Sequence, residues 1–249
     1  MSHHGSMPVQ RPAVPEAAAH QPRRVTSFRS RRSALTEAQQ GVWDRLWPAL
    51  GRQADGEEKL DVAGWFGREA PLILEIGCGT GTSTLAMAQA EPDLDVIAVE
   101  VYRRGLAQLL SAIDRSSEDA HPVTNIRIIR GDGTDVLEHL LTPASLTGIR
   151  VFFPDPWPKA RHHKRRLIQP PTVALMADRL RPGGVLHAAT DHADYAEQIA
   201  EVGDAEPLLR RAEPDEPLPI STARPTTKYE TKAHHAGSAV TEFIWVRRA

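Results

Sequence analysis

Apolar residues along the chain form short runs rich in Val and Ile, and these runs alternate with longer segments in which apolar positions recur every three or four residues. This alternation predicts a parallel sheet whose strands are joined by crossover helices. We expect strands at residues 72–76, 96–99, 126–129, 151–153 and 185–189, and a final strand at 240–247. We expect helices at residues 82–90, 103–113, 136–141, 172–180 and 193–202. The predicted fold class is therefore α/β.

The chain outside this alternating region divides into segments of different character. Residues 1–26 are rich in Pro, Ala, Gln and His without an apolar period, and we expect a disordered tail there. Residues 27–70 should form a basic arm, a helix and a linker, and residues 71–249 the α/β domain. Thr36 and Gln39 match a capping box at the start of that helix, with Trp43 and Leu46 on its apolar face. We expect a polar linker at 51–61, a core that starts near residue 71, and an irregular connection at 207–225.

Composition limits the class of protein. A chain of 249 residues can hold one α/β domain and a tail, and its net charge of −2 argues against a surface that is basic throughout. The single Cys78 excludes a disulfide framework and a thiolate zinc site, which fits a reducing compartment. The sequence has neither an apolar run near the roughly 20 residues of a membrane span nor a signal-peptide core, so we expect a cytoplasmic protein without membrane contact.

A glycine-rich turn follows the first predicted strand of the domain. The sequence Glu-Ile-Gly-Cys-Gly-Thr-Gly at 75–81 places Gly77, Gly79 and Gly81 where a strand turns into a helix, so a ligand can approach the backbone closely. Dinucleotides and S-adenosylmethionine both use such turns. The G-x-G-x-G spacing is one residue short of the dinucleotide fingerprint, and Glu75 would repel a pyrophosphate. The turn therefore favours the cationic ligand, S-adenosylmethionine.

Acidic residues follow three successive predicted strands. Glu75 and Glu100 end the first two strands, and Asp132 follows the third. Each acid alone could be a helix cap. All three at strand carboxyl ends, where open α/β sheets bind their ligands, indicate a binding site in which Glu100 accepts from ribose hydroxyls and Asp132 from an exocyclic amine.

A proline-rich loop follows the fourth predicted strand. Prolines at 154, 156 and 158 restrict Asp155 and Trp157, a carboxylate and an indole that suit a planar ligand with a polar edge. For Trp157, burial in the core is an equally strong alternative. Five positive charges in the eight residues from 159 to 166 then favour binding of phosphates, and arginines at 23–32 form a second basic cluster. The His162–His163 and His234–His235 pairs lack the spacing and the carboxylate partner of a metal site, so we assign no metal.

Together these residues resemble the tRNA (guanine-N7)-methyltransferases of the bacterial single-chain type. The most specific part of the resemblance is the run Phe-Phe-Pro-Asp-Pro-Trp-Pro-Lys-Ala-Arg-His-His-Lys-Arg-Arg at 152–166. Segments 74–81, 97–101, 189–191, 195–196 and 224–230 also match, so the resemblance extends from about residue 27 to residue 245. Two positions depart from the family pattern: Tyr102 replaces a histidine and Tyr229 replaces a phenylalanine.

The resemblance implies a Rossmann-like, S-adenosylmethionine-dependent methyltransferase fold with a C-terminal antiparallel strand. It also implies roles for individual positions. The implied cofactor-binding residues are Glu75, Gly77, Gly79, Gly81, Glu100, Asp132 and Asp155, and Asp155 is also the implied catalytic residue. The implied substrate-binding residues are Lys159, Asp191, Thr227, Lys228, Tyr229 and Glu230, and the implied RNA-contacting residues are Arg161, Lys164, Arg165 and Arg166.

The implied reaction transfers the methyl group of S-adenosylmethionine to N7 of a variable-region guanine in tRNA, leaving S-adenosylhomocysteine. Guanine N7 already carries an in-plane lone pair, so alignment and electrostatic stabilisation are the main requirements. Two alternatives remain open: a nicotinamide-dependent oxidoreductase on a similar sheet, and an RNA-binding module with an inactive methyltransferase core. The sequence leaves a monomer and a homodimer equally open.

Overall fold

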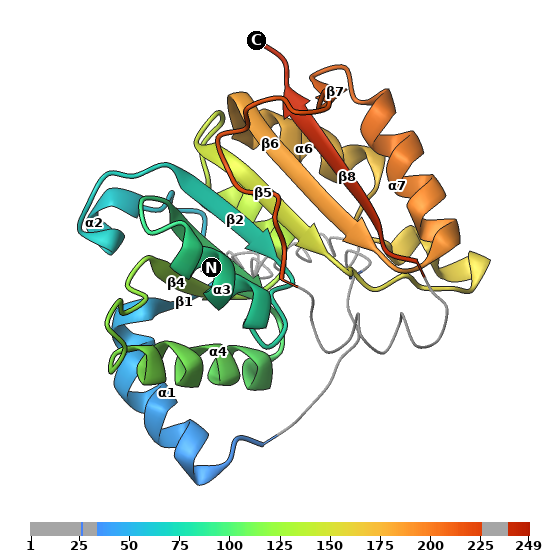
Figure 1. Cartoon of the computed structure of the whole chain (residues 1–249). Coiled ribbons are helices and arrows are strands. Elements are labelled where there is room, and N and C mark those ends of the chain that lie inside the picture. The colour runs from blue at the N-terminus through green and yellow to red at the C-terminus, as the bar shows by residue number, and fades with distance from the viewer. Residues whose placement is uncertain (1–25, 27–33, 226–238) are drawn as a thin grey trace, which may run out of the picture.

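The computed structural model describes residue 26 and residues 34–225 and 239–249. Eight strands in this part of the chain form one sheet in the order β1-β4-β3-β2-β5-β6-β8-β7 (Figure 1). The strands are β1 Gly51–Gln53, β2 Leu72–Ile76, β3 Asp95–Glu100, β4 Ile126–Arg130, β5 Leu146–Phe152, β6 Leu180–Thr190, β7 Leu209–Arg211 and β8 Thr241–Arg247. Neighbouring strands are parallel from β1 to β6, whereas β8 is antiparallel to β6 and to β7.

Helices cover both faces of this sheet. They are α1 Glu37–Leu50, α2 Val62–Phe66, α3 Thr82–Ala90, α4 Arg103–Ser116, α5 Gly133–Asp135, the π-helical turn η1 Val136–Leu140, the 3-10 helix η2 Ala160–Arg165, α6 Pro170–Arg179 and α7 Ala193–Ala205. The predicted mixed α/β class with a C-terminal antiparallel strand is confirmed. The predicted strands and helices are found, most of them a few residues longer than predicted.

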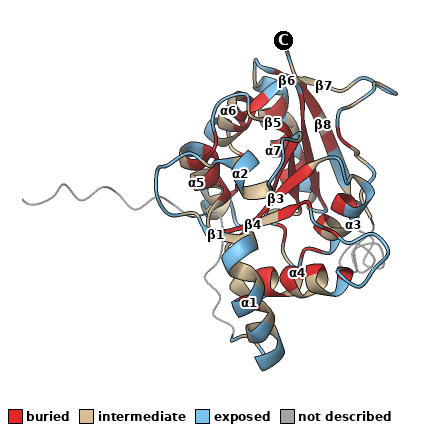
Figure 2. Cartoon of the chain, turned by 90° about the vertical axis from the view of Figure 1, so that its left-hand side faces the viewer, coloured by how far each residue is buried: buried red, intermediate tan, exposed pale blue. Residues whose placement is uncertain are grey.

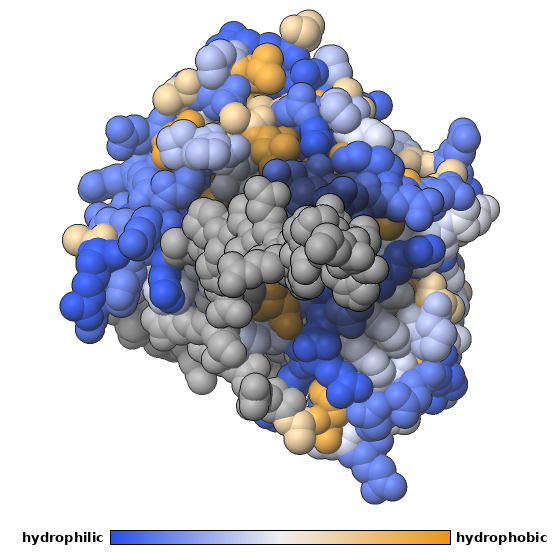
Figure 3. Space-filling model, turned by 180° about the vertical axis from the view of Figure 1, so that it is seen from behind, coloured by the Kyte–Doolittle hydropathy of each residue, from blue (hydrophilic) through white to orange (hydrophobic). Residues whose placement is uncertain are grey.

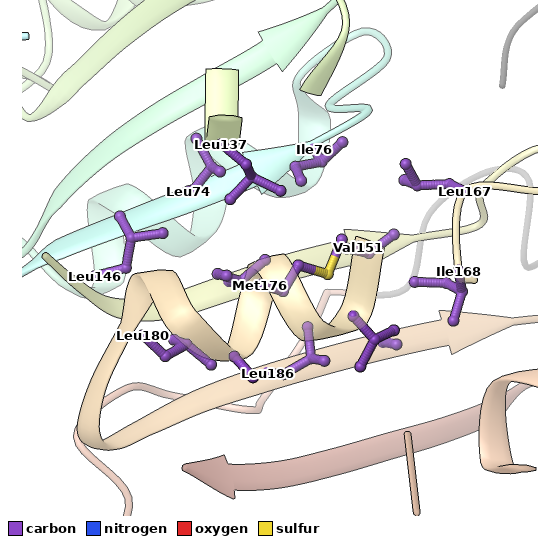
Figure 4. Close-up of a cluster of buried hydrophobic side chains, with 14 of the residues drawn as sticks. Leu74, Ile76, Leu137, Leu146, Val151, Leu167, Ile168, Met176, Leu180 and Leu186 are labelled. Carbon is purple, nitrogen blue, oxygen red and sulfur yellow. The ribbon is translucent and has the colours of Figure 1, made fainter. Parts of the chain in front are cut away.

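Each face of the sheet has its own apolar layer, because successive side chains of a strand point to opposite sides. Leu74, Ile76 and Val151 pack with η1, α6 and α7 on one face (Figure 4). Ile73 and Val96 pack with α1, α3 and α4 on the other. Figure 2 shows the same arrangement as buried strands between helices whose outer sides are exposed. Packing on both faces of the sheet thereby holds the ends of the strands in place.

Helix α1 is part of the hydrophobic core, which therefore begins earlier in the sequence than we expected. The predicted capping box is present, with Gln39 N donating to Thr36 Oγ1 over 3.2 Å and Thr36 N donating to Gln39 Oε1 over 3.1 Å. Trp43 is buried, and the Arg45 guanidinium bonds Asp114 of α4 over 2.6 Å. The expectation that the core starts near residue 71 is therefore wrong, since the apolar face of α1 packs on α4.

Two predicted irregular segments contain strands. The predicted linker 51–61 begins with β1, which pairs in parallel with β4, and the predicted connection 207–225 contains β7, which pairs with β8. Both strands have only three residues and are stabilised by backbone hydrogen bonds. They are too short to show an alternation of apolar and polar residues, so the sequence did not predict them. The backbone N–H of Ala54 continues the β1 pairing by donating to Arg130 O over 3.0 Å. This contact places the end of β1 next to Gly131 at the end of β4.

Large apolar side chains are rarely exposed in the described part of the chain. Among the described residues Leu208 is the large hydrophobic side chain that is exposed, and hydrophilic residues predominate on the face that Figure 3 shows. A search of the described helices finds none with the length and apolarity that crossing a bilayer requires.

Candidate active site

The strand order reverses beside β2, and a cavity lies at that reversal. The chain places β3 and β4 on one side of β2 and β5 and β6 on the other. In open α/β sheets ligands bind in the crevice at such a reversal, outside the carboxyl ends of the strands. Here the residues that follow β2, β3, β4 and β5 line a cavity of about 150 Å³, which we call the central cavity.

The predicted acidic residues gather at this place. Glu100, Asp132 and Asp155 all line the central cavity, together with Gly77. Glu75 is one residue before Ile76 on β2 and is only 3% exposed, but it is not among the residues that line this cavity. Three of the four predicted carboxylates, from the ends of β3, β4 and β5, therefore surround one space, whereas Glu75 lies outside its lining.

The glycine-rich turn needs its glycines because of its backbone conformation. Gly77, Gly79 and Gly81 all have positive φ, at 81°, 57° and 75°, where an L side chain is strained. The N–H groups of Gly77 and Cys78 donate to Val99 O of β3, over 2.8 and 3.1 Å. These bonds fix the turn to the end of β3, and Gly77 lines the central cavity, whereas Gly79 and Gly81 are not among its lining residues.

Glu100 ties this turn to helix α4. Its Oε2 accepts from Gly79 N over 3.0 Å, and its Oε1 accepts from the N–H groups of Val101 and Tyr102 over 2.7 and 3.0 Å. Burial raises the pKa of Glu100, and the charge of Asp155 raises it further, whereas these three backbone N–H groups lower it. A carboxylate has about four acceptor positions, so Glu100 can hold the loop and still accept from a ligand.

Asp132 also combines a local role with a place on the cavity. It is the N-cap of α5, and its Oδ1 accepts from Thr134 N over 2.9 Å. For Glu100 and Asp132 the local backbone contact and a ligand-binding role are therefore compatible, because both side chains bond backbone N–H groups and line the cavity.

Glu75 and Cys78 are both buried beside the site. Burial raises the pKa of Glu75 to about 6, although the guanidinium of Arg150 lowers it. Burial also raises the pKa of the Cys78 thiol, and the carboxylates of Glu75 and Glu100 raise it further. The thiol is therefore protonated at neutral pH, which fits a structural rather than a nucleophilic Cys78.

The loop that carries Asp155 has an unusual backbone. Phe153 and Trp157 both have positive φ, at 51° and 44°, a conformation that bulky residues rarely adopt. Prolines at 154, 156 and 158 restrict the positions between them. Phe153 N donates to Ala189 O over 2.8 Å and so fixes the start of the loop to β6. Asp155 is consequently held at one place on the cavity wall.

Trp157 fills the core beneath this loop. Its side chain is only 4% exposed, the guanidinium of Arg165 lies 4.8 Å from the ring centroid, and His162 contacts the ring edge-on at 5.9 Å. Of the two interpretations drawn from the sequence, core packing is the one that the structure shows. The indole supports the loop, and the expectation that it faces a planar ligand is wrong.

Arg166 differs from its expected role on the RNA surface. It is 3% exposed, and its guanidinium donates to Pro156 O over 2.8 Å and to Gln198 Oε1 over 2.7 Å. It also pairs with Asp194 and stacks over the Tyr195 ring at 4.7 Å. Contact with RNA through this side chain is therefore contradicted by its burial. Its partners on α7 are close to 30 residues away in the sequence, so no local pattern could have revealed them.

The other expected substrate and RNA residues are more accessible. Lys159, Arg161, Lys164 and Asp191 are exposed, and Arg165 is half-buried. Lys164, Arg165, Gln169 and Thr172 line a groove beside η2. The predicted substrate residues Thr227, Lys228, Tyr229 and Glu230 lie outside the described residues, as do the N-terminal arginines and the His234–His235 pair. Within the described part of the chain, no group of three or more His, Cys, Asp or Glu side chains could hold a metal ion.

Two residues that sequence reasoning missed help to build the cavity. Tyr102, noted from the sequence only as a departure from the family, lines the central cavity and is the N-cap of α4. Gly105 of α4 lies against the glycine-rich turn, so that a Cβ atom there would be 2.3 Å from Gly79 O. A glycine inside an amphipathic helix is the signal that could have identified it.

Comparison with known proteins identifies relatives over almost the whole chain. The family model described as "Putative methyltransferase" matches residues 69–243. The tRNA (guanine-N(7)-)-methyltransferase of Mycolicibacterium gilvum is 66% identical over 99% of both chains, and that of Mycobacterium avium is 63% identical over 100% of both. A solved 16S rRNA methyltransferase, KamB, superposes with a TM-score of 0.49 at 18% identity, over 77% of this chain and 95% of that one.

Replacing Gly105 tests the contact between α4 and the glycine-rich turn. Gly105→Ala should lower the free energy of unfolding by about 1–3 kcal/mol, because the new Cβ meets backbone that cannot rotate away. Gly41→Ala in α1 is the matched control. No atom lies within 4 Å of its Cβ, so it should stabilise by about 0.5–1 kcal/mol. Urea unfolding measures both, and equal stabilisation by the two substitutions would contradict the described packing.

Proposed function

The chain belongs to the tRNA (guanine-N7)-methyltransferase family, and from this premise we propose that the central cavity is its site for S-adenosylmethionine and for the guanine that is methylated. The observation that carries the proposal is the convergence of Glu100, Asp132 and Asp155 on one cavity, with Glu75 buried on β2 one residue before the lining residue Ile76. S-adenosylmethionine supplies an electrophilic methyl group on a sulfonium cation. The reaction is methyl transfer to N7 of a guanine in tRNA.

The chemistry of the cavity fits a cationic ligand. Three carboxylates line it, and Oε2 of Glu75, one residue before the lining residue Ile76, is buried without a hydrogen-bond partner among the described residues. A buried acceptor in this state is costly, and a ligand that donates to it or carries positive charge offsets that cost. A pyrophosphate would meet the same carboxylates as like charges. The acids therefore favour S-adenosylmethionine over a dinucleotide and argue against the oxidoreductase alternative.

Asp155 is the proposed catalytic residue. Guanine presents the donors N1–H and the 2-amino group on one edge and the nucleophilic N7 on another, so a carboxylate that accepts from the donor edge can orient N7 without blocking it. Positive charge appears on the purine as the methyl group arrives, and a carboxylate held in place stabilises it. The restrained backbone around Asp155 suits this role, because the residue does not have to be ordered during the reaction.

Exposed cations near η2 provide the proposed tRNA contact. Lys159 and Arg161 are exposed, and Lys164 and Arg165 line a groove that shares Leu167 with the central cavity. Backbone phosphates determine most of the affinity for folded RNA, whereas the target base must leave its stacked position to reach a cavity. Selection of a variable-region guanine would then depend on the shape of the tRNA.

Methyl transfer from labelled S-adenosylmethionine to unmodified tRNA tests the function as a whole. Label should enter the tRNA as N7-methylguanosine, and a transcript made with 7-deazaguanosine should accept none because the nucleophilic nitrogen is missing. S-adenosylhomocysteine should raise the melting temperature, whereas NADH should not. Stabilisation by NADH without methyl transfer would favour the oxidoreductase, and RNA binding without transfer would favour the inactive module.

Replacing Asp155 tests its assignment. Asp155→Asn should reduce the rate of transfer at saturating substrates by at least about 100-fold, because an amide carries no charge and presents a donor to the guanine edge. The affinity for tRNA should change little. Asp119→Asn, a change to an exposed acid after α4, serves as the control. Single-turnover kinetics with wild-type rates for Asp155→Asn would exclude the residue from the reaction.

Reversing charge along the groove tests the RNA contact. Lys164→Glu combined with Arg165→Glu should weaken tRNA binding and make the dependence of log K on log salt shallower by roughly one for each lost phosphate contact. Arg181→Glu, at an exposed position in β6, is the control and should leave the slope unchanged. Filter binding at several salt concentrations measures it, and an unaltered slope in the double variant would place the RNA elsewhere.

A further inference from the structure

A buried arginine lies beside Glu75 and has no part in the proposed function so far. Arg150 is on β5 and is fully buried. Its Cα is the register partner of Glu75 on the adjacent parallel strand β2. Partners in neighbouring strands project their side chains from the same face of a sheet, so the guanidinium and the carboxylate are neighbours in a region from which water is excluded.

Arg150 is held in place from its other side. One nitrogen, Nη2, donates to Glu91 Oε2 over 2.6 Å and to Ser221 O over 3.1 Å. Glu91 Oε1 accepts in turn from Ser221 N over 2.6 Å. The end of α3, the strand β5 and the backbone at residue 221 thus form a clamp that fixes the position of the guanidinium.

The two guanidinium nitrogens of Arg150 outside this clamp lack hydrogen-bond partners among the described residues. Its Nε and Nη1 have no hydrogen-bond partner among the described residues, and neither has Glu75 Oε2. Unpaired donors of a buried guanidinium and an unpaired oxygen of a buried carboxylate are each costly alone, but their opposite charges attract strongly in a low dielectric. An arginine placed in this way favours the ionised form of its neighbour.

We infer that Arg150 is a positioning residue for the cofactor site, whose buried guanidinium keeps the Glu75 carboxylate ionised and available to a cationic ligand. The inference rests on the proposed function, because it takes Glu75 to bind S-adenosylmethionine. Glu75, Arg150 and the partly buried Glu91 together have a net charge of −1, so the group attracts a cation although the guanidinium balances one of its carboxylates. Without Arg150 no cation would balance the buried carboxylate of Glu75, and it would take up a proton more readily.

The surroundings of Glu75 contain other groups that could affect its ionisation. Those described are the Thr84 hydroxyl on α3, the Cys78 thiol in the glycine-rich turn, the Glu100 carboxylate at the end of β3, and His187 of β6 opposite Arg150. The thiol stays protonated, and Glu100 is bonded to three backbone N–H groups. His187 Nε2 bonds Glu242 Oε2 over 2.8 Å, so it has an acid partner of its own. Arg150 is accordingly the permanent cation directly beside Glu75.

The dependence of cofactor affinity on pH tests this inference. The pKa of Glu75 is raised to about 6, so the wild-type affinity for S-adenosylmethionine should fall by up to about tenfold per pH unit as the pH drops below that value. In Arg150→Met the fall should begin at least about one pH unit higher, and affinity should recover at alkaline pH. Arg150→Lys keeps the charge and should stay near the wild-type curve. Isothermal titration calorimetry between about pH 5 and pH 9 measures these curves.

A second buried arginine provides the control for structural damage. Arg179 is 8% exposed and donates to Leu137 O over 2.7 Å on the opposite face of the sheet. Arg179→Met should lower the melting temperature without moving the midpoint of the affinity curve. A uniform loss of affinity at every pH in Arg150→Met, or an unchanged curve, would overturn the inference.

Glu75→Gln separates this inference from the proposed function. It should bind S-adenosylmethionine weakly and without a pH dependence near 6, and adding Arg150→Met to it should cause no further loss. Wild-type affinity in Glu75→Gln would overturn both the assignment of Glu75 and the role of Arg150. Because these measurements follow cofactor binding alone, absence of methyl transfer to tRNA would contradict the proposed function and leave the inference standing.

Discussion

Removal of carboxylates from water at the carboxyl end of the sheet is the constraint on which the rest of the site depends. Glu75 and Glu100 are both buried, and a buried charge is tolerated only when other groups compensate for lost hydration. For Glu100 the compensation comes from three backbone N–H groups. That arrangement requires the glycine-rich turn to lie over the end of β3 and α4 to start directly after it. The backbone path around the end of β3 therefore supplies the hydrogen bonds that stabilise the buried carboxylate of Glu100.

The loop with Asp155 is supported by a different kind of interaction. Trp157 packs beneath it, and Arg166 reaches from its far end to Pro156 O and to side chains of α7. Such contacts over-determine a backbone that would otherwise relax from the positive φ values at Phe153 and Trp157. The residues of the basic run therefore have two different roles. Arg166 stabilises the loop, whereas Lys159, Arg161 and Lys164 remain exposed.

The sequence predicted the fold and much of the site because the relevant signals were local. Apolar runs identified the central strands, and acids directly after those strands had to meet at one edge of a parallel sheet. Prediction was wrong for Arg166 because its deciding partners lie far away in the chain, on α7. For Trp157 the sequence left core packing and ligand contact equally open, and its burial against Arg165 and His162 decides between them. The strands β1 and β7 were missed since three residues joined by backbone hydrogen bonds carry no side-chain period.

The pairing of β1 with β4 has a consequence for where this protein can be divided. The family model begins at residue 69, whereas β1 ends at Gln53 and is the outermost strand on its side of the sheet. A fragment cut at that border would leave the N–H and C=O groups of β4 unpaired along an open edge, immediately before Asp132. Bare edges of this kind recruit other chains. The strand β1, ahead of the matched region, thus covers the edge of the sheet, and the smallest unit expected to stay soluble is larger than the region that the family model matches.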